Sequence, residues 1–229
     1  YTLFNQKTFI SKKIPIVNSP LFRTLFDNKF SQYLAFSAYM PKTILVESER
    51  KFLQKLSKIP SELIVAKEIY GSGGKNVSIK EKADIISLKG TFVYPIILQE
   101  FIETIGLPEL SDDIEIADLR LVYIGTDLIY ALSRRAQKGS FHTNFHKGAH
   151  AVLIPLEKIP RSCISMADEI RKTFSHFENI NYSLDFMFNK QGFPFLIEIN
   201  TTPGFDLLRI VGTPEIKNNY YSRLLDSFN

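Results

Sequence analysis

Cysteine is nearly absent from this chain of 229 residues, in which Cys163 is the single one. One cysteine cannot close an internal disulfide, so we expect a reducing, cytoplasmic compartment. No apolar run approaches the ~20 residues of a transmembrane helix, and the first residues, YTLFNQKTF, lack the apolar core of a signal peptide. These absences weigh against a membrane protein. An initiator methionine is also missing, as in a piece of a longer chain.

A strong charge of either sign is lacking too. The 28 basic and 24 acidic side chains leave a net charge of +4 and a pI near 9.0, and they are spread along the chain. A solvated surface explains most of this balance, and an anionic ligand is the sharper interpretation. Nucleic acid is the weaker one, because neither a zinc-finger spacing nor an aromatic RNA-binding signature occurs. The 45% hydrophobic content is enough for a substantial core in one large or two small domains.

No internal repeat or low-complexity segment interrupts the chain, which alternates between helical and extended patterns. Capped or amphipathic segments predict helices at 18–39, 49–57 and 162–177, the first of them with Pro20 in its opening turn. Apolar and alternating segments predict strands at 44–48, 63–69, 94–102, 117–125 and 127–135, and a hairpin at 182–200. This order predicts an α+β fold of two sheet-and-helix units that meet near residues 99–102.

The second strand of the hairpin ends in polar residues, in the stretch FLIEINTTPGF. Because strand side chains alternate, Leu196, Glu198 and Asn200 are expected on one face. Asp185 on the first strand can join them, and such oxygen ligands suit Mg²⁺ beside substrate phosphates. Taken alone, each polar residue could equally be an exposed acid, a cap or part of a satisfied polar network. The three together, followed by a Pro-Gly turn, favour a metal site next to a nucleotide.

A candidate phosphate-binding loop occurs in AKEIYGSGGKNVSI. Lys67 follows an apolar strand, and another short strand comes after the loop of Gly71, Ser72, Gly73 and Gly74. Glycines let backbone N–H groups approach phosphate oxygens, and the lysine supplies a positive charge. An ordinary glycine-rich turn is the alternative, since the Gly-Lys-Ser/Thr and following helix of a P-loop are absent.

Six segments resemble, in order, the successive motifs of the ATP-grasp superfamily, and those of its RimK-like carboxylate–amine ligases in particular. They are DNKF, VAKEIYGSGGKNV, LQEFIE, DLRLVYIG, RRAQKGSFHTNFHKGA and DFMFNKQGFPFLIEINTTPG, within a resemblance that runs from Asn18 to Gly204. The resemblance implies an ATP-grasp fold in which two sheet-and-helix subdomains clasp ATP. Its expected parts are an N-terminal helical segment (1–40) joining a missing or reduced preceding domain, a lid subdomain (41–98), and a C-terminal subdomain with the metal site (99–229).

The resemblance also implies roles for single residues. Lys29 and Lys67 look like the two lysines that hold ATP phosphates, and residues 71–74 look like the mobile loop that closes over them. The implied nucleotide pocket consists of Gln99, Glu100, Phe101 and Ile102, whose backbone reads adenine, of Glu103 near the ribose, and of Asp118. The implied ligands for Mg²⁺, or alternatively Mn²⁺, are Asp185, Glu198 and Asn200.

Three further residues are expected where phosphate meets the acceptor, namely Arg120, Arg134 and Asn144. An arginine on a strand that lines this cavity can hold phosphate or carboxylate through two parallel hydrogen bonds. For Arg120, the alternative is a surface cation paired with Asp118 or Asp127. Asn144 is similar to a family asparagine that helps to hold nucleotide and substrate.

Departures from the family pattern concern the acceptor more than ATP. Where RimK-like enzymes usually read FRSNLHRGG, this chain reads FHTNFHKGA, so that His142 and Lys147 replace arginines. His142 is interpreted either as a titratable ligand for an anion or as a loop residue without a role. The segment TIGLPELSDDIE before Asp118 is longer than the usual turn and could shape a different acceptor site.

The resemblance therefore implies an ATP-dependent ligase that joins a carboxylate to an amine through an acyl phosphate and releases ADP and phosphate. Its partners would be small-molecule or peptide substrates, and a homo-oligomer is left open. A phosphotransferase on the same fold and a regulatory ATP-binding module remain as alternatives. The retained metal ligands argue against the regulatory module.

Overall fold

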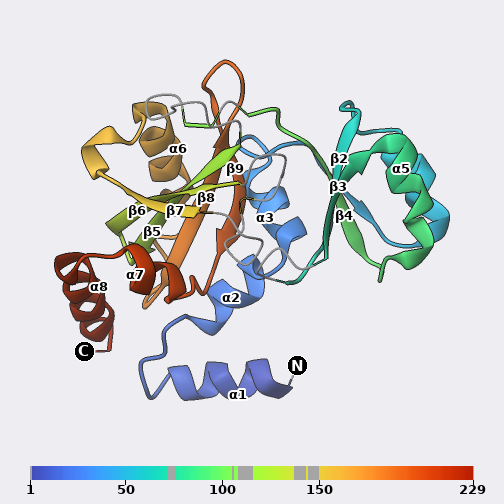
Figure 1. Cartoon of the computed structure of the whole chain (residues 1–229). Helices are drawn as coiled ribbons and strands as arrows, with labels where there is room; N and C mark the ends of the chain where they lie inside the picture. The colour runs from blue at the N-terminus through green and yellow to red at the C-terminus, as the bar shows by residue number, and fades with distance from the viewer. Residues whose placement is uncertain are drawn as a thin grey trace.

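The computed structural model describes residues 2–71, 76–104, 106–107, 116–136, 143 and 150–228. Two antiparallel sheets lie side by side, each with its own helices (Figure 1). The predicted α+β class is therefore confirmed. The strands that the apolar and alternating segments predict begin and end within two residues of the predicted positions.

The smaller sheet has four strands in the order β1-β4-β2-β3. Their bounds are β1 Thr43–Val46, β2 Leu63–Glu68, β3 Val77–Glu81 and β4 Ile96–Glu100. The helices beside them are α4 (Phe52–Leu56), which follows the 3₁₀ turn η1 (Glu49–Lys51), and α5 (Lys82–Ser87), which precedes η2 (Lys89–Thr91). Fully buried Phe52, Ile64 and Ile85 join sheet and helices in one separate core, because one face of such a sheet must be covered.

The larger sheet has five strands in the order β7-β6-β5-β8-β9. Their bounds are β5 Ala117–Ile124, β6 Asp127–Arg135, β7 His150–Ile154, β8 Asn181–Phe188 and β9 Pro194–Asn200. One face packs on α2 (Pro20–Phe26), α3 (Lys29–Phe36) and α6 (Arg161–Lys172), the last of which follows η4 (Leu156–Lys158). Cys163 of α6 is fully buried there, as expected for a thiol that serves packing.

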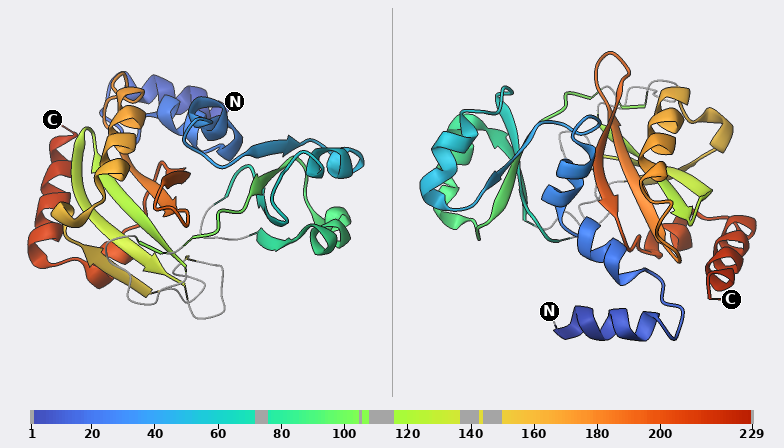
Figure 2. Two further views of the ribbon diagram at one scale, coloured as in Figure 1. Left: turned by 90° about the horizontal axis from the view of Figure 1, so that it is seen from above. Right: turned by 180° about the vertical axis from the view of Figure 1, so that it is seen from behind.

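The opposite face of this sheet is divided between an apolar and a polar part. Val122 and Ile124 of β5 pack against α7 (Asp206–Val211) and α8 (Pro214–Asp226), on the side away from α6 (Figure 2). Asp118 and Arg120 precede them on the same face, because side chains two apart on a strand point the same way. The polar part therefore lies where the cover of α7 and α8 ends.

The single helix predicted at 18–39 is wrong, because the segment forms α2 and α3 with a break at Asp27 and Asn28. Asn28 adopts an extended backbone conformation, and its side chain accepts hydrogen bonds from the N–H groups of Phe30 and Ser31. A second helix therefore begins at Lys29, because an asparagine cap satisfies N–H groups that the first turn leaves unpaired.

α1 (Thr2–Ser11), which lies next to α2, falls in the helical segment expected at 1–40, whereas α5, β7, α7 and α8 were not predicted from the sequence. The helix predicted at 162–177 ends earlier, at Lys172. None of the helices in the described part of the chain is long and apolar enough to cross a membrane.

Candidate functional site

The hairpin of β8 and β9 brings the three predicted metal ligands together. Asp185 lies directly opposite Glu198, and Ser183 lies opposite Asn200. The pairing then shifts, so that Phe186 faces Leu196, which leaves Ile197 as the extra residue of a β-bulge. The expectation that Leu196 shares a face with Glu198 is therefore wrong. Leu196 and Ile199 both enter the core below the sheet.

A cluster of ion pairs spans three neighbouring strands around Asp185. Arg120 lies opposite Asp185 and donates to both of its carboxylate oxygens, each at 2.7 Å. Arg134 lies opposite Asp118, donates to it at 2.9 and 2.5 Å, and donates to Asp185 Oδ2 at 2.7 Å. Asn200 Nδ2 donates to the same oxygen at 3.1 Å. Strand register thus builds the cluster, since cross-strand neighbours on one face lie in contact.

Burial and charge act in opposite directions on Asp185. The residue is only 2% exposed, and this burial disfavours the ionised form, but Arg120 and Arg134 outweigh burial and lower the pKa of Asp185 to about 2. Asp118 and Asp185 in turn raise the pKa of Arg134, although burial alone would lower it. Arg120 is therefore not a surface cation paired with Asp118 or Asp127. Asp118 has a further donor in Thr143, whose hydroxyl lies 2.7 Å away.

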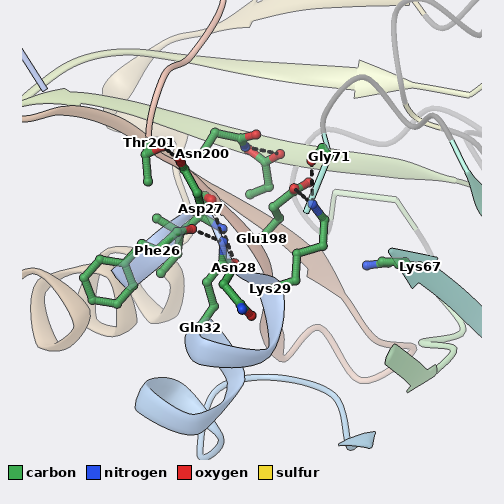
Figure 3. A network of polar contacts seen from close by, with 12 residues as sticks. Phe26, Asp27, Asn28, Lys29, Gln32, Lys67, Gly71, Glu198, Asn200 and Thr201 are labelled. Carbon is green, nitrogen blue, oxygen red and sulfur yellow. Dashed lines mark hydrogen bonds and ion pairs between the residues drawn. The ribbon is translucent and has the colours of Figure 1, made fainter. Parts of the chain in front are cut away.

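Lys29, the first residue of α3, links the two sheets. Its ammonium lies 3.1 Å from Glu198 Oε1 and donates to the Gly71 carbonyl at 2.6 Å, while its backbone N–H donates to the Ile69 carbonyl at 2.9 Å (Figure 3). Gly71 has a φ of +135°, in a range that favours glycine. Lys29 thus connects the start of α3 with the segment that follows β2 and with Glu198, a candidate metal ligand.

Lys67 approaches the same place from β2, and Figure 3 shows its ammonium directed towards Lys29 and Glu198. It donates to Gln99 Oε1 at 2.8 Å. Burial lowers its pKa to about 8, with Glu198 opposing and Lys29 adding to the shift. Among the described residues of the site, Glu198, Asp185 and Asp118 pair with Lys29, Arg120 and Arg134, and Lys67 adds a further cation. A cationic surplus is suited to a polyanionic ligand.

Some of the remaining predicted site residues lie in the described part of the chain, and the others lie outside it. Gln99 is buried on β4 and Glu100 ends that strand, whereas Glu103 is exposed and pairs with Lys190 in the β8–β9 turn. Phe101 and Ile102 continue the chain from β4 towards Thr104, which forms a bridge to Asn189. Outside the described residues lie Ser72, Gly73, Gly74, His142, Asn144 and Lys147.

The oxygen donors fit a hard divalent cation. Asp185 and Glu198 supply carboxylates and Asn200 supplies an amide, and Mg²⁺ commonly combines one or two carboxylates with waters and phosphates. Among the described residues, no group of three or more His, Cys, Asp or Glu side chains could hold a metal. A metal at this place would therefore depend on the amide or on a ligand's own oxygens.

Sequence reasoning missed three residues of the site, namely Thr143, Thr201 and Gln32. The Thr201 hydroxyl bonds Asp27 immediately before the α3 cap, and Gln32 bonds the backbone of β9. The available signal for Gln32 was a polar residue on the buried stripe of α3, four positions before Phe36.

Comparisons with known proteins identify the two-sheet architecture around this site as an ATP-grasp fold. The sequence profile described as the RimK-like ATP-grasp domain matches residues 28–219. The chain therefore belongs to the RimK-like ATP-grasp family.

Individual relatives are distant. A probable alpha-L-glutamate ligase of Psychromonas ingrahamii is 27% identical over 172 residues, which are 73% of this chain and 51% of that protein. The chain thus spans about half the length of this curated relative.

Solved structures support the fold. The RiPP-associated ATP-grasp ligase of Chryseobacterium gregarium, in complex with ADP and a leader and core peptide, has a TM-score of 0.67 at 20% identity, covering 99% of this chain and 66% of that one. The ATP-grasp ligase PsnB, complexed with a precursor variant, Mg and ADP, has a TM-score of 0.61 at 13% identity, covering 92% and 61%.

Proposed function

We propose that this chain is the ATP-using part of a ligase that joins a carboxylate to an amine, with glutamate as the first amine to test. The supporting facts are its membership of the RimK-like family and its similarity to probable alpha-L-glutamate ligases. The observation that carries the proposal is the ion cluster of Arg120, Arg134 and Asp185 beside Glu198 and Lys29. The cluster combines the oxygens of the proposed metal ligands with cations that would face a phosphoryl group.

ATP is proposed to bind between the sheets, with residues 41–98 as the lid and 99–229 as the metal-bearing subdomain, preceded by a helical segment at 1–40. Lys29 and Lys67 would hold phosphates, and the backbone at 99–102 would read the adenine. Mg²⁺, with Mn²⁺ as a substitute, would be held by Asp185, Glu198 and Asn200 and would neutralise phosphate charge. This arrangement is supported by the short contacts of Lys29 with Glu198 and with Gly71.

The chemistry required of the chain is positioning and charge neutralisation. The acceptor carboxylate would attack the γ-phosphorus, breaking the bond to the β-phosphate oxygen and releasing ADP. The amine would then attack the resulting acyl phosphate, lose a proton and release phosphate. Arg120 and Arg134 are held by Asp185 in fixed orientations, and such preorganised charges stabilise a transferring phosphoryl group with little rearrangement.

A hydroxylamine trap tests this function. With ATP, Mg²⁺ and a panel of acids that includes amino acids and peptides, an acyl phosphate should be captured as a hydroxamate, and glutamate should compete with hydroxylamine. Arg134→Lys keeps the charge but loses the two-pronged contact, so hydroxamate formation should fall by about 10². Arg135→Lys, the next residue of β6, is the matched control and should retain the parent rate.

Two results would overturn the proposal. A stable phosphorylated acid without hydroxamate would identify a phosphotransferase, and nucleotide binding without ADP release under every acceptor would identify a regulatory module. Intact folding of each variant is checked by thermal unfolding, since breaking a buried pair altogether costs about 3–5 kcal/mol. That cost is the reason to prefer Arg134→Lys over alanine.

A further inference from the structure

We infer that Gln32 is a positioning residue, which fixes the end of α3 that carries Lys29 against the strand that carries Glu198 and Asn200. Among the described residues, its side chain bonds backbone groups of Phe26 and Ile199, which are not predicted ligands of ATP or metal. The inference rests on the proposed function, because it gives Gln32 a part in the same site.

The Gln32 amide is 2% exposed and makes three hydrogen bonds to backbone groups. Its Nε2 donates to the Phe26 carbonyl at 2.7 Å and to the Ile199 carbonyl at 2.8 Å, and its Oε1 accepts from the Ile199 N–H at 2.9 Å. A neutral amide has two N–H donors, and both are used here. The side chain therefore has one well-defined orientation.

The contact replaces a missing strand. β9 is an edge of the five-stranded sheet, so one side of its backbone has no neighbouring strand. Gln32 bonds both the N–H and the carbonyl of Ile199, as a paired strand would, and the Tyr39 carbonyl accepts from the Leu196 N–H at 2.8 Å. The edge of β9 is thereby held at two points, by α3 at Ile199 and by the segment after α3 at Leu196.

Fixing Ile199 also fixes the residues on either side of it. Ile199 points into the core, so Glu198 and Asn200 point to the opposite face, where the ion cluster lies. Gln32 stands about one turn after Lys29 on α3, and the Lys29 ammonium reaches Glu198 at 3.1 Å. Helix α3 thus contacts β9 twice, through Gln32 at Ile199 and through Lys29 at Glu198 (Figure 3).

Packing alone does not explain an amide at this position. Gln32 lies on the same buried side of α3 as Phe36, where a leucine or methionine would fill the volume. Burying an amide costs free energy unless its hydrogen bonds are made. What the amide adds is a fixed register between α3 and β9, and small displacements of catalytic groups are costly to turnover.

The test uses Gln32→Met, which keeps the volume and removes all three hydrogen bonds. Mn²⁺ binding is measured by electron paramagnetic resonance with a non-hydrolysable ATP analogue, beside steady-state kcat and KM. We expect Mn²⁺ to bind about tenfold more weakly, and kcat to fall by 10- to 100-fold, on the order of the loss from a misplaced group. Ile170→Ala is the matched control, since Ile170 is buried in the same core on α6. It should lower the melting temperature and leave Mn²⁺ affinity within about twofold.

The inference is overturned if Gln32→Met keeps the parent Mn²⁺ affinity and kcat. It is also overturned if Ile170→Ala loses Mn²⁺ affinity equally for the same drop in melting temperature, because the role is then only structural. If Gln32→Met does not fold, Gln32→Glu decides by the same criteria, since it keeps an acceptor for Ile199. A parent protein that binds Mn²⁺ and the analogue but makes no hydroxamate refutes the ligase and leaves this binding test intact.

Discussion

Glu198 and Lys67 are the residues whose properties depend most on their neighbours in the site. Glu198 is partly exposed and, among the described residues, forms an ion pair with Lys29, whereas Asp185 on the paired strand is buried between two arginines. The stretches EIN, with Glu198, and LDF, with Asp185, identify the two acids but do not show that their environments differ. Their different partners predict different roles, with Glu198 as the more readily exchanged metal ligand.

Glu198→Gln should therefore weaken the dependence on Mg²⁺ without unfolding the protein. Loss of a carboxylate should raise the Mg²⁺ concentration for half-maximal ATP turnover by about tenfold or more. The cost in stability should stay within about 1 kcal/mol, because the pair with Lys29 is partly exposed. Turnover is measured across a Mg²⁺ titration, with the exposed Glu169→Gln as control. An unchanged Mg²⁺ dependence would show that Glu198 is not a ligand.

The lowered pKa of Lys67 predicts that the protein takes up protons when nucleotide binds. With a pKa of about 8, about half of the Lys67 side chains are neutral at pH 8, and a phosphate contact would favour the charged form. Calorimetry at pH 8 in buffers of different ionisation enthalpy should thus detect uptake of about half a proton, which Lys67→Met should abolish. Equal uptake by parent and variant would assign the proton to another group.

The same residue predicts a pH dependence of stability. The pKa of Lys67 is about 8 in the folded chain, below the ordinary lysine value of 10.5 that applies to the unfolded chain. Between these values the unfolded chain binds more protons, so the contribution of Lys67 to the free energy of unfolding rises with pH. Denaturant titrations from pH 7.5 to pH ~10.5 should show a steeper rise for the parent than for Lys67→Met. Parallel curves would contradict the lowered pKa.

At the scale of elements, the start of α3 controls the position of Lys29. The Asn28 side chain caps this helix through Phe30 and Ser31, and its amide also donates to the Tyr70 hydroxyl at 3.3 Å. α8 has a comparable cap, in which Thr213 accepts from the Ile216 N–H, and that cap lies on α8, outside the ion cluster. The two caps offer a matched comparison between stability and site geometry.

Asn28→Ala and Thr213→Ala should each lower the free energy of unfolding by about 1 kcal/mol. Only Asn28→Ala should also raise the KM for ATP, by several-fold, because without the cap the backbone at Lys29 is no longer held in place and the ammonium is less well positioned. Chemical denaturation and ATP kinetics on both variants measure the two effects. A KM increase of the same size in Thr213→Ala would mean that lost stability, not the position of Lys29, is responsible.

At the scale of the whole molecule, the two sheets have separate cores and are joined near the site. The core around Phe52 and Ile64 belongs to the smaller sheet, and the core around Phe22 and Leu184 belongs to the larger one. The Lys29 contacts with Ile69 and Gly71 connect them. A ligand that binds between the sheets would couple their stabilities, because it would contact both.

Hydrogen exchange should therefore slow in both sheets when Mg²⁺ and a non-hydrolysable ATP analogue bind. At about 100 times the dissociation constant, the ligand should add about 2.7 kcal/mol to the free energy of opening. Amides of β2 and of β9 should gain protection together, and Lys29→Met should weaken the gain in β2. Protection confined to one sheet would contradict binding between them.

Sequence by itself determined the local features of this protein. Short apolar segments with polar residues at intervals specified β5, β6 and the hairpin, because strands of a sheet that is covered on both faces bury most of their side chains. Lys29, Lys67 and Asp185 were recognisable because their motifs are contiguous. The prediction that Glu198 and Asn200 lie on the same face of β9 is confirmed, because the strand pairing is regular between them.

Only the tertiary structure decided how these pieces meet. The bulge at Ile197 directs Leu196 into the core, and the Asn28 cap divides the predicted helix in two. Arg120 pairs with Asp185, and Arg134 pairs with Asp118. Gln32 reaches a backbone 167 residues away in the sequence. Such pairings depend on register and on packing between distant segments, because a side chain's partner is set by the surface that covers it and not by its sequence neighbours.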